Sequence, residues 1–371
     1  MRNYRFIISG GGTGGHIFPA ISIANTLKER YPNAEFLFVG AEGKMEMEKV
    51  PTAGYRIVGL PVRGFDRQHL MHNFSVVGKL IDSLVKARKV IRTFAPDVTI
   101  GVGGFASGPT LWIASSMGIP TLIQEQNSYA GVTNKLLSKK ARRICVAYKG
   151  MERYFPKDRI VLTGNPVRKN LVEVCSTKNE ALAYFGLSPD KPTILVVGGS
   201  LGARTINQSI QHGLDSFLAK DIQVIWQTGR LYYDTAIKHL KPYQTKDIYC
   251  HDFITRMDLA YLAADLVVSR AGASSISELC LLRKSVILVP SPNVAEDHQT
   301  KNAKALASKG AALLVTDAEA PSKLVDLTFQ TLLDKEKLAS LGNNIELFAI
   351  NNSAERIVDE IEKLLKNKDN R

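Results

Sequence analysis

Short runs of apolar residues alternate with segments of helical periodicity along the whole chain. Eleven runs predict strands, at residues 6–9, 35–39, 98–102, 121–124, 144–147, 160–162, 193–197, 223–227, 266–269, 285–289 and 312–315. Most of these runs are continuous and do not alternate with polar residues, which is typical of strands covered on both faces of a parallel sheet. Strand and helix in alternation predict an α/β fold with doubly wound parallel sheets.

One part of this pattern occurs twice. Residues 5–27 read RFIISGGGTGGHIFPAISIANTL, and residues 193–214 read TILVVGGSLGARTINQSIQHGL. In both, a buried strand leads into a glycine-rich turn and then into a helix with one apolar face, formed by Ile17, Ala20, Ile21, Ala24 and Leu27 in the first copy and by Ala203, Ile206, Ile210 and Leu214 in the second. Each copy is typical of the opening of a Rossmann-like domain, so the chain is predicted to hold two.

The domain boundary is placed where glycine and proline interrupt the pattern, in TGNPVRKN at residues 163–170. We therefore expect an N-terminal domain at residues 1–165 and a C-terminal domain at residues 166–345. The last segment, 346–371, is predicted to be a helix with an apolar stripe of Ile357, Ile361 and Leu364.

Composition narrows the class of protein. The 371 residues are 45% apolar and 22% charged, as in soluble proteins of about two domains. No apolar stretch approaches the roughly 18 residues of a membrane span, and the N-terminus turns into the glycine loop too early for a secretion signal. The four cysteines lie far apart without metal or redox spacing, which fits a reducing cytoplasm. The net charge of +13 leaves nucleic acid, anionic membrane or a phosphorylated substrate as partners.

Four glycine-rich turns follow predicted strands. They read GGGTGGH at 10–16, GVGGFASGP at 101–109, GGSLGA at 198–203 and SRAGASSISE at 269–278. Backbone N–H groups in such turns, together with the positive end of the following helix, bind anions. Ligands of open α/β sheets bind at these ends of the strands, so the turns predict a phosphate-containing ligand.

A dinucleotide-dependent dehydrogenase is the first alternative. Gly10, Gly12 and Gly15 satisfy the pattern G-x-G-x-x-G. That pattern also requires an acidic residue at the end of the second strand to bind ribose. The nearest candidate, Glu42, lies too late and beyond a glycine, and a dehydrogenase needs one glycine turn of this kind and not two.

The motifs as a set resemble those of the MurG family of glycosyltransferases. The resemblance runs from about residue 4 to the final helix and rests on GGGTGGHIFPA, GVGGFASGP, QEQNSYAGVTNK, TGNPVR, VVGGSLGAR, DFITRM, SRAGASSISE and AEDHQTKNA, in this order. It implies the GT-B fold, in which two Rossmann-like domains face a cleft and the last helix returns to the first domain. It also implies an inverting transfer of N-acetylglucosamine from UDP-N-acetylglucosamine to the C4 hydroxyl of undecaprenyl-pyrophosphoryl-MurNAc-pentapeptide, a step of peptidoglycan synthesis.

The resemblance further implies that no metal or other cofactor is needed, and the sequence contains no Asp-x-Asp metal motif. In the family, Thr13, Gly14 and Gly15 belong to a loop that touches the donor and the acceptor diphosphate. His16 is the candidate base, because a helix start disfavours the protonated imidazole and leaves a neutral ring able to accept a proton. Glu125 is the other candidate base, and a histidine that merely hydrogen-bonds the loop remains an alternative.

The other site residues are also implied by the resemblance. Asn127 would contact the sugar, although asparagine often shapes turns. Arg168 would reach the donor unless it is a solvated hinge residue. Ser200 would bind phosphate or serve as an ordinary helix cap. Ile254 would offer backbone groups to uracil, with Phe253 nearby.

Two more residues complete the expected donor site. Glu278 would take the two ribose hydroxyls, although Ser275 and Glu278 also have the spacing of a capping box, which needs no ligand. Gln299 would contact sugar hydroxyls or simply lie on a surface helix. The sequence departs from the family pattern at Gln124, where the family commonly has histidine, and at Thr255 and Arg256, where an acidic residue is expected.

A lipid-linked acceptor requires the protein to reach a membrane. Residues 74–94 predict an amphipathic helix with Lys79, Lys86, Arg88, Lys89 and Arg92, and with a candidate apolar face of Phe74, Val77, Leu80, Ile81 and Leu84. SKKARR at 138–143 adds a second basic cluster. We expect peripheral binding to the anionic, cytoplasmic face of the plasma membrane, the alternative being a helix that only covers the sheet.

Two other functions remain as alternatives. A UDP-N-acetylglucosamine 2-epimerase shares the two-domain layout and needs no lipid-facing surface. A non-catalytic binder of nucleotide or nucleic acid could use the positive charge. The several glycine turns disfavour nucleic acid as a partner, since its binding proteins concentrate charge along a groove or helix with stacking aromatic residues.

Overall fold

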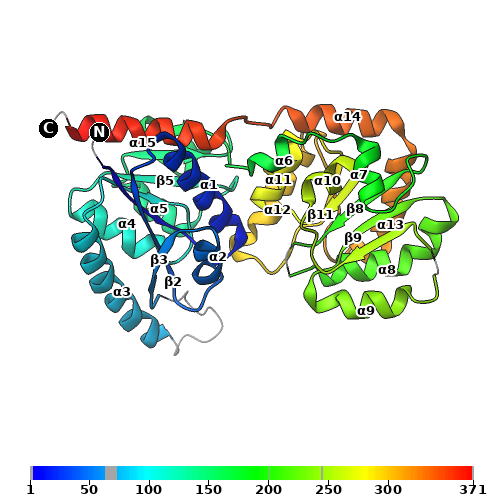
Figure 1. Ribbon diagram of the computed structural model, residues 1–371, viewed down its shortest axis with the longest axis horizontal. Coiled ribbons are helices and arrows are strands. Elements are labelled where there is room, and N and C mark those ends of the chain that lie inside the picture. Colours follow the sequence, from blue (N-terminus) through cyan, green and yellow to red (C-terminus); the bar gives the residue numbers. More distant parts are fainter. Residues whose placement is uncertain (1–2, 63–72, 200, 244, 370–371) are drawn as a thin grey trace. The chain divides into compact units, whose positions relative to one another are not determined.

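A computed structural model describes residues 3–62, 73–199, 201–243 and 245–369 of the chain (Figure 1). The chain divides into two compact units, one comprising Met1–Val167 with Ile350–Arg371 and the other comprising Arg168–Ala349. Each unit contains one parallel β-sheet with helices around it, so the predicted class of two doubly wound, Rossmann-like units is confirmed.

The sheet of the first unit has seven strands in the described residues, in the order β3-β2-β1-β4-β5-β6-β7. The strands are β1 (Arg5–Ser9), β2 (Glu35–Ala41), β3 (Arg56–Leu60), β4 (Val98–Gly101), β5 (Thr121–Glu125), β6 (Arg143–Val146) and β7 (Ile160–Leu162). The helices are α1 (Gly14–Arg30), α2 (Glu46–Thr52), α3 (Asn73–Phe94), α4 (Ser107–Ser116), α5 (Val132–Ser138) and α15 (Ser353–Asp369).

The second unit repeats this plan with six strands in its described part, in the order β10-β9-β8-β11-β12-β13. The strands are β8 (Thr193–Val197), β9 (Gln223–Gln227), β10 (Ile248–His251), β11 (Leu266–Ser269), β12 (Val286–Leu288) and β13 (Leu313–Leu314). The helices are α6 (Lys169–Val172), α7 (Lys178–Tyr184), α8 (Arg204–Ala219), α9 (Arg230–Leu240), α10 (Met257–Ala263), α11 (Ala273–Leu281), α12 (His298–Ala307), α13 (Ala320–Leu333) and α14 (Lys335–Glu346).

The continuous hydrophobic runs are explained by burial on both faces of each sheet. In β1, Phe6 and Ile8 belong to one core cluster, which includes residues of α1 and α15. Ile7 points the other way, into a cluster with residues of α3 and α4. Because both faces are covered, the three successive positions Phe6, Ile7 and Ile8 are all apolar.

All eleven predicted strands are present, and two strands were not predicted. Both of these, β3 and β10, lie at the edge of their sheets. Strand β3 reads RIVGL and strand β10 reads IYCH, and each is only partly buried. Their apolar runs are short and are interrupted by a glycine or by polar residues, so their sequences carry a weaker hydrophobic signal than those of the other two edge strands, β7 and β13, which were predicted.

The C-terminal helix α15 belongs to the first unit and packs against α1. The predicted stripe of Ile357, Ile361 and Leu364 is buried in the same core as β1. At the surface, Arg30 of α1 makes an ion pair with Asp359 at 2.6 Å. The helix therefore completes the covering of one face of the first sheet.

Helix α3 confirms the predicted amphipathic segment but corrects its apolar face. Leu84 packs against the core beside the buried Ala87 and Ile91, so it is not part of an exposed face. Leu80 and Ile81 are exposed, as predicted, and Val85 joins them. The side chains of Phe74 and Val77 lie outside the described residues.

The four glycine-rich turns lie at corresponding places in the two sheets. In the first sheet, strand order reverses between β1 and β4, and in the second between β8 and β11. Ligands of open α/β sheets bind at such switch points, beyond the carboxyl ends of the strands. The turns that follow these four strands are the four that the sequence singled out, which makes them the candidate site in each unit.

None of the helices in the described part of the chain is both long enough and apolar enough to cross a membrane.

Candidate active site

His16 lies in the first turn of α1, directly after the first glycine turn. The helix begins at Gly14, with Thr13 as its N-cap. The ring nitrogen Nδ1 of His16 lies 2.9 Å from the carbonyl oxygen of Gly11. Because a carbonyl oxygen only accepts, Nδ1 must carry the proton, and in the neutral ring Nε2 then carries the lone pair. The local geometry thus selects one tautomer.

The turn after β4 leaves room for this ring. Gly103 has a φ of +94°, and a Cβ built there would lie 2.8 Å from Nε2 of His16. Any other residue would therefore collide with the imidazole as well as strain the backbone. The N–H of Gly11 also donates to the carbonyl of Gly103 at 3.3 Å, which joins the two turns.

Glu46, which no sequence motif marks as a site residue, forms hydrogen bonds to the backbone of the first glycine turn. It is fully buried at the start of α2, and its carboxylate accepts from the N–H groups of Gly12 at 2.8 Å and Ala41 at 2.9 Å. The N–H of Gly12 is therefore already occupied by an anion. Any contact of this turn with a diphosphate falls to the residues that follow, Thr13, Gly14 and Gly15.

Glu125, the other candidate base, is committed to its own loop. This buried carboxylate accepts from the backbone and side chain of Asn127, at 3.1 and 3.3 Å. It also accepts from the N–H of Gly131 at 3.1 Å and from the side chain of Asn134 at 2.8 Å. These hydrogen bonds use both carboxylate oxygens to hold the loop, so Glu125 has a structural role in its own segment.

Gln124 occupies the position at which the MurG family commonly has histidine, and its amide is part of a hydrogen-bond network. Its side chain is buried and donates to Asn165 at 2.8 Å, while Gln126 donates to Gln124. Gln126 donates further to the carbonyl of Val102 at 2.7 Å, in the turn after β4. These amides therefore tie the QEQN segment to one of the glycine turns.

In the second unit, two side chains contact Glu278 of α11. The hydroxyl of Tyr261 donates to Oε2 of Glu278 at 3.0 Å, and Arg168 lies 3.7 Å from Oε1. Burial raises the pKa of Glu278 above its ordinary value, and Arg168 and Tyr261 offset part of that shift. The structure thus brings Arg168 and Glu278 together, and it adds Tyr261, whose sequence context offers no signal beyond an apolar helix.

The capping-box interpretation of Glu278 is wrong. Helix α11 begins at Ala273, and its N-cap is Gly272. Ser275 is therefore already inside the helix, one turn away from Glu278 and unable to act as the cap. The position of Glu278 has to be explained by its contacts with Tyr261 and Arg168.

Gln227 at the end of β9 connects two other predicted parts of the donor site. Its Nε2 donates to the carbonyl of Gly199 at 3.2 Å, and its Oε1 accepts from the N–H of Ile254 at 3.0 Å. Ile254 is buried, whereas Phe253 is half exposed. Ser200 lies outside the described residues.

Gln299, on α12, is the last of the expected residues. Its Oε1 accepts from the N–H of Ser291 at 2.9 Å, which holds the loop after β12. On the same side of the second sheet, Arg270 donates to the carbonyls of Val289 and Pro290, both at 3.0 Å. The loops after β11 and β12 are thus fastened to each other.

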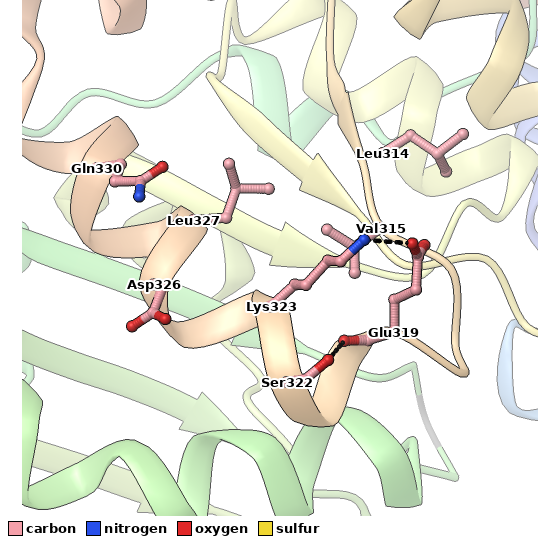
Figure 2. A pocket seen from close by; sticks show the side chains of 8 residues that line it. All are labelled: Leu314, Val315, Glu319, Ser322, Lys323, Asp326, Leu327 and Gln330. Carbon is pink, nitrogen blue, oxygen red and sulfur yellow. Dashed lines mark hydrogen bonds and ion pairs between the residues drawn. The ribbon is translucent and has the colours of Figure 1, made fainter.

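Within the described residues, no three or more His, Cys, Asp and Glu side chains are grouped so that they could hold a metal ion. A shallow pocket beside α13 is lined by none of the predicted site residues (Figure 2). Its charged pair, Lys323 and Glu319, is satisfied internally at 2.6 Å. The glycine turns, and not this pocket, remain the candidate site.

Comparison with known proteins identifies the family of the chain. Residues 6–146 match the glycosyltransferase family 28 N-terminal domain, and residues 193–368 match the glycosyltransferase family 28 C-terminal domain. A relative from Parabacteroides distasonis, named UDP-N-acetylglucosamine–N-acetylmuramyl-(pentapeptide) pyrophosphoryl-undecaprenol N-acetylglucosamine transferase, is 68% identical over 99% of this chain and 100% of its own length.

Solved structures show the same fold. The crystal structure of MurG from Acinetobacter baumannii has a TM-score of 0.78 at 26% identity and covers 98% of this chain and 100% of that one. A UDP-GlcNAc 2-epimerase from Neisseria meningitidis has a TM-score of 0.67 at 13% identity, covering 98% and 100%, and at that identity it shows only a shared fold. With both domains of the family matched and a full-length relative at this identity, the chain belongs to glycosyltransferase family 28, as a member of the MurG family.

Proposed function

We propose that the protein transfers N-acetylglucosamine from UDP-N-acetylglucosamine to the C4 hydroxyl of undecaprenyl-pyrophosphoryl-MurNAc-pentapeptide in peptidoglycan synthesis. The observation that carries this proposal is the 68% identity, over the whole length of both chains, to a transferase named for these substrates. In the reaction, the acceptor oxygen forms a bond to the anomeric carbon, the bond to UDP breaks, and UDP leaves with the electron pair.

His16 is the proposed base. The acceptor hydroxyl loses its proton as it attacks, and Nε2 of His16 is the nitrogen left unprotonated when Nδ1 donates to Gly11. The ring lies in the first turn of α1, where the helix dipole disfavours a positive charge. Glu125 is the weaker candidate, because its oxygens already accept from Asn127, Gly131 and Asn134.

The second unit is proposed to hold the donor. Glu278 would accept from the two ribose hydroxyls, a role that suits a carboxylate held in place by Tyr261. Arg168, 3.7 Å away, would move towards the donor's phosphate or sugar oxygens when a ligand competes for it. Ser200, Ile254, Gln299 and, in the first unit, Thr13, Gly14, Gly15 and Asn127 are proposed as further substrate contacts.

The proposal is tested by measuring where the labelled N-acetylglucosamine is found after the reaction. Purified protein is incubated with UDP-N-acetylglucosamine labelled in the sugar and with the lipid-linked acceptor in detergent. Label is expected in the lipid fraction only when the acceptor is present. Label that stays on UDP as the 2-epimer would instead establish the epimerase, and no conversion of the sugar in either form would establish a binder.

The protein is also proposed to bind membranes through one face of the first unit. Exposed apolar side chains occur on neighbouring helices, namely Ile81 and Val85 on α3, Trp112 on α4 and Leu136 on α5. Lys140 lies 4.2 Å above the Trp112 ring, so charge and apolar surface are adjacent. Each basic residue near anionic lipid contributes about 1 kcal/mol.

Vesicle co-sedimentation tests this surface. Binding is expected to require anionic lipid and to fall as salt rises, because exposed charges are screened. The double variant I81E/V85E should bind less, since it places two negative charges at the apolar face. L333E, at an exposed leucine of the second unit, is the matched control and should bind as the parent does. Binding that ignores lipid charge and salt would contradict the proposal.

A further inference from the structure

The peptide group between Gly11 and Gly12 is hydrogen-bonded at both of its ends. Its carbonyl accepts from Nδ1 of His16 at 2.9 Å. Its N–H donates to Oε2 of Glu46 at 2.8 Å. Because a peptide group is planar and rigid, the orientation imposed at one end is transmitted to the other. A buried carboxylate and the imidazole are thus linked through a single intervening group.

The carboxylate has a site built for it. Glu46 is fully buried, and its second oxygen accepts from the N–H of Ala41 at 2.9 Å. A Cβ at Gly11 would lie 2.1 Å from Oε1, and a Cβ at Gly40 would lie 2.5 Å from Cγ. Two positions must therefore be glycine for the side chain to fit. Burying a charge is costly unless it is well hydrogen-bonded, and Glu46 meets that condition through these two N–H groups.

The chemical consequence falls on His16. An anion at the N–H end polarises the peptide group and makes its carbonyl a stronger acceptor, since hydrogen bonds in series reinforce one another at low dielectric. A stronger acceptor at Gly11 holds the proton on Nδ1 and directs the lone pair of Nε2 away from the loop. In serine proteases an aspartate does this by direct contact with histidine.

We propose that Glu46 is a positioning residue that fixes the tautomer and orientation of His16 through the Gly11–Gly12 peptide. This inference rests on the proposed function, in which His16 is the base. It explains why Glu46 is buried against Gly12, a residue 34 positions away in the sequence. Glu46 itself touches neither substrate nor reacting atoms.

The first test needs no substitution. The protein is labelled with ¹⁵N in its histidine rings, and the His16 signals are assigned by their loss in H16A. At a pH where the ring is neutral, Nδ1 is expected to be the protonated nitrogen and Nε2 the bare one. A His16 ring protonated at Nε2 would overturn the proposal, whatever the activity of any variant.

The second test is a double-mutant cycle. In E46Q the side chain keeps its size but has one accepting oxygen, so it cannot serve both Gly12 and Ala41. We expect kcat to fall roughly 10-fold to 100-fold, by analogy with the loss found when the hydrogen-bond partner of a metal-ligating histidine is removed. The KM for UDP-N-acetylglucosamine should change by less than about 3-fold, because Glu46 is not among the proposed donor contacts, and Glu278 and Arg168 belong to the second unit. The NMR signature of His16 should shift towards the other tautomer.

The double-mutant cycle distinguishes an effect of Glu46 on catalysis through His16 from a general loss of protein stability. If Glu46 acts through His16, E46Q lowers kcat no further in the H16A background. Equal losses in both backgrounds would overturn the proposal. E48Q, at an exposed glutamate of the same helix, is the matched control and should keep the parent kcat. If H16A itself keeps the parent kcat, the base assignment fails, and the tautomer measurement still decides the Glu46–His16 link on its own.

Discussion

The two copies of the strand–turn–helix unit share a sequence pattern but differ in what holds their turns. The first turn is held by a carboxylate, since Glu46 takes the N–H of Gly12. The second is held by a neutral amide, since Gln227 donates to the carbonyl of Gly199. A carboxylate beside a turn repels a diphosphate, whereas an amide does not. The difference supports the proposal that His16 beside the first turn acts as the base, while the second unit holds the nucleoside of the donor.

The strongest way to break this comparison is to remove the imidazole. H16A is expected to lower kcat about 10²-fold to 10⁴-fold, the usual contribution of a general base. Donor affinity, measured by calorimetry with UDP, should stay within about 2-fold, because the proposed ribose contact, Glu278, belongs to the second unit and His16 is not among the proposed donor contacts. H239A, at an exposed histidine of α9, is the control. A weakened donor site with intact kcat would reverse the assignment.

The second-largest effect is expected from replacing Glu278 of the second unit. E278Q removes the charge that would accept from the ribose, and hydrogen bonds to a charged group contribute about 2 kcal/mol, so the Kd for UDP should rise about 30-fold. E346Q, at an exposed glutamate of α14 paired with Arg283, is the control. Unchanged UDP affinity in E278Q would place the ribose elsewhere.

The same residue predicts a pH dependence. Burial raises the pKa of Glu278, so the carboxyl takes up a proton at a higher pH than an exposed glutamate does. Because only the ionised form accepts from both hydroxyls, UDP affinity should weaken as pH falls through that raised pKa. Calorimetry across this range should show the loss in the parent and a flatter profile in E278Q.

A smaller effect is expected from removing the tyrosine hydroxyl that donates a hydrogen bond to Glu278. Y261F removes the hydroxyl that donates to Glu278 at 3.0 Å, and one such bond contributes about 1 kcal/mol. The Kd for UDP should therefore rise about 5-fold. In the E278Q background the same change should have less effect, because the two residues act together. Equal effects in both backgrounds would separate Tyr261 from donor binding.

The smallest effect is expected from chelation. If N–H groups and helix N-termini stabilise the leaving diphosphate, excess EDTA should change turnover by less than about 2-fold. The measurement is the rate of sugar transfer before and after dialysis against the chelator. Loss of activity that Mg²⁺ or Mn²⁺ restores would show that a cation stabilises the leaving diphosphate. The contrast between the two turns would then not explain how the diphosphate is stabilised.

The sequence by itself determined the strands, the turns and their repeat. Most of the eleven predicted strands could be found because burial on both faces leaves a run of consecutive apolar residues, such as Phe6, Ile7 and Ile8. Strands β3 (RIVGL) and β10 (IYCH) were missed because each is only partly buried and its apolar run is short and interrupted. The four glycine turns were also visible, since close backbone approach leaves glycine at fixed places in the sequence.

Only the tertiary structure decided which side chains act on these turns. Glu46 and Gln227 lie far along the chain from the glycines that they contact, and Tyr261 meets Glu278 from a different helix. The alternative of a capping box at Ser275 and Glu278 is excluded for the same reason, because the spacing fits but the helix begins at Ala273. Local patterns encode strands and turns, but hydrogen-bond partners depend on which strands become neighbours, and that is settled only when the sheet assembles.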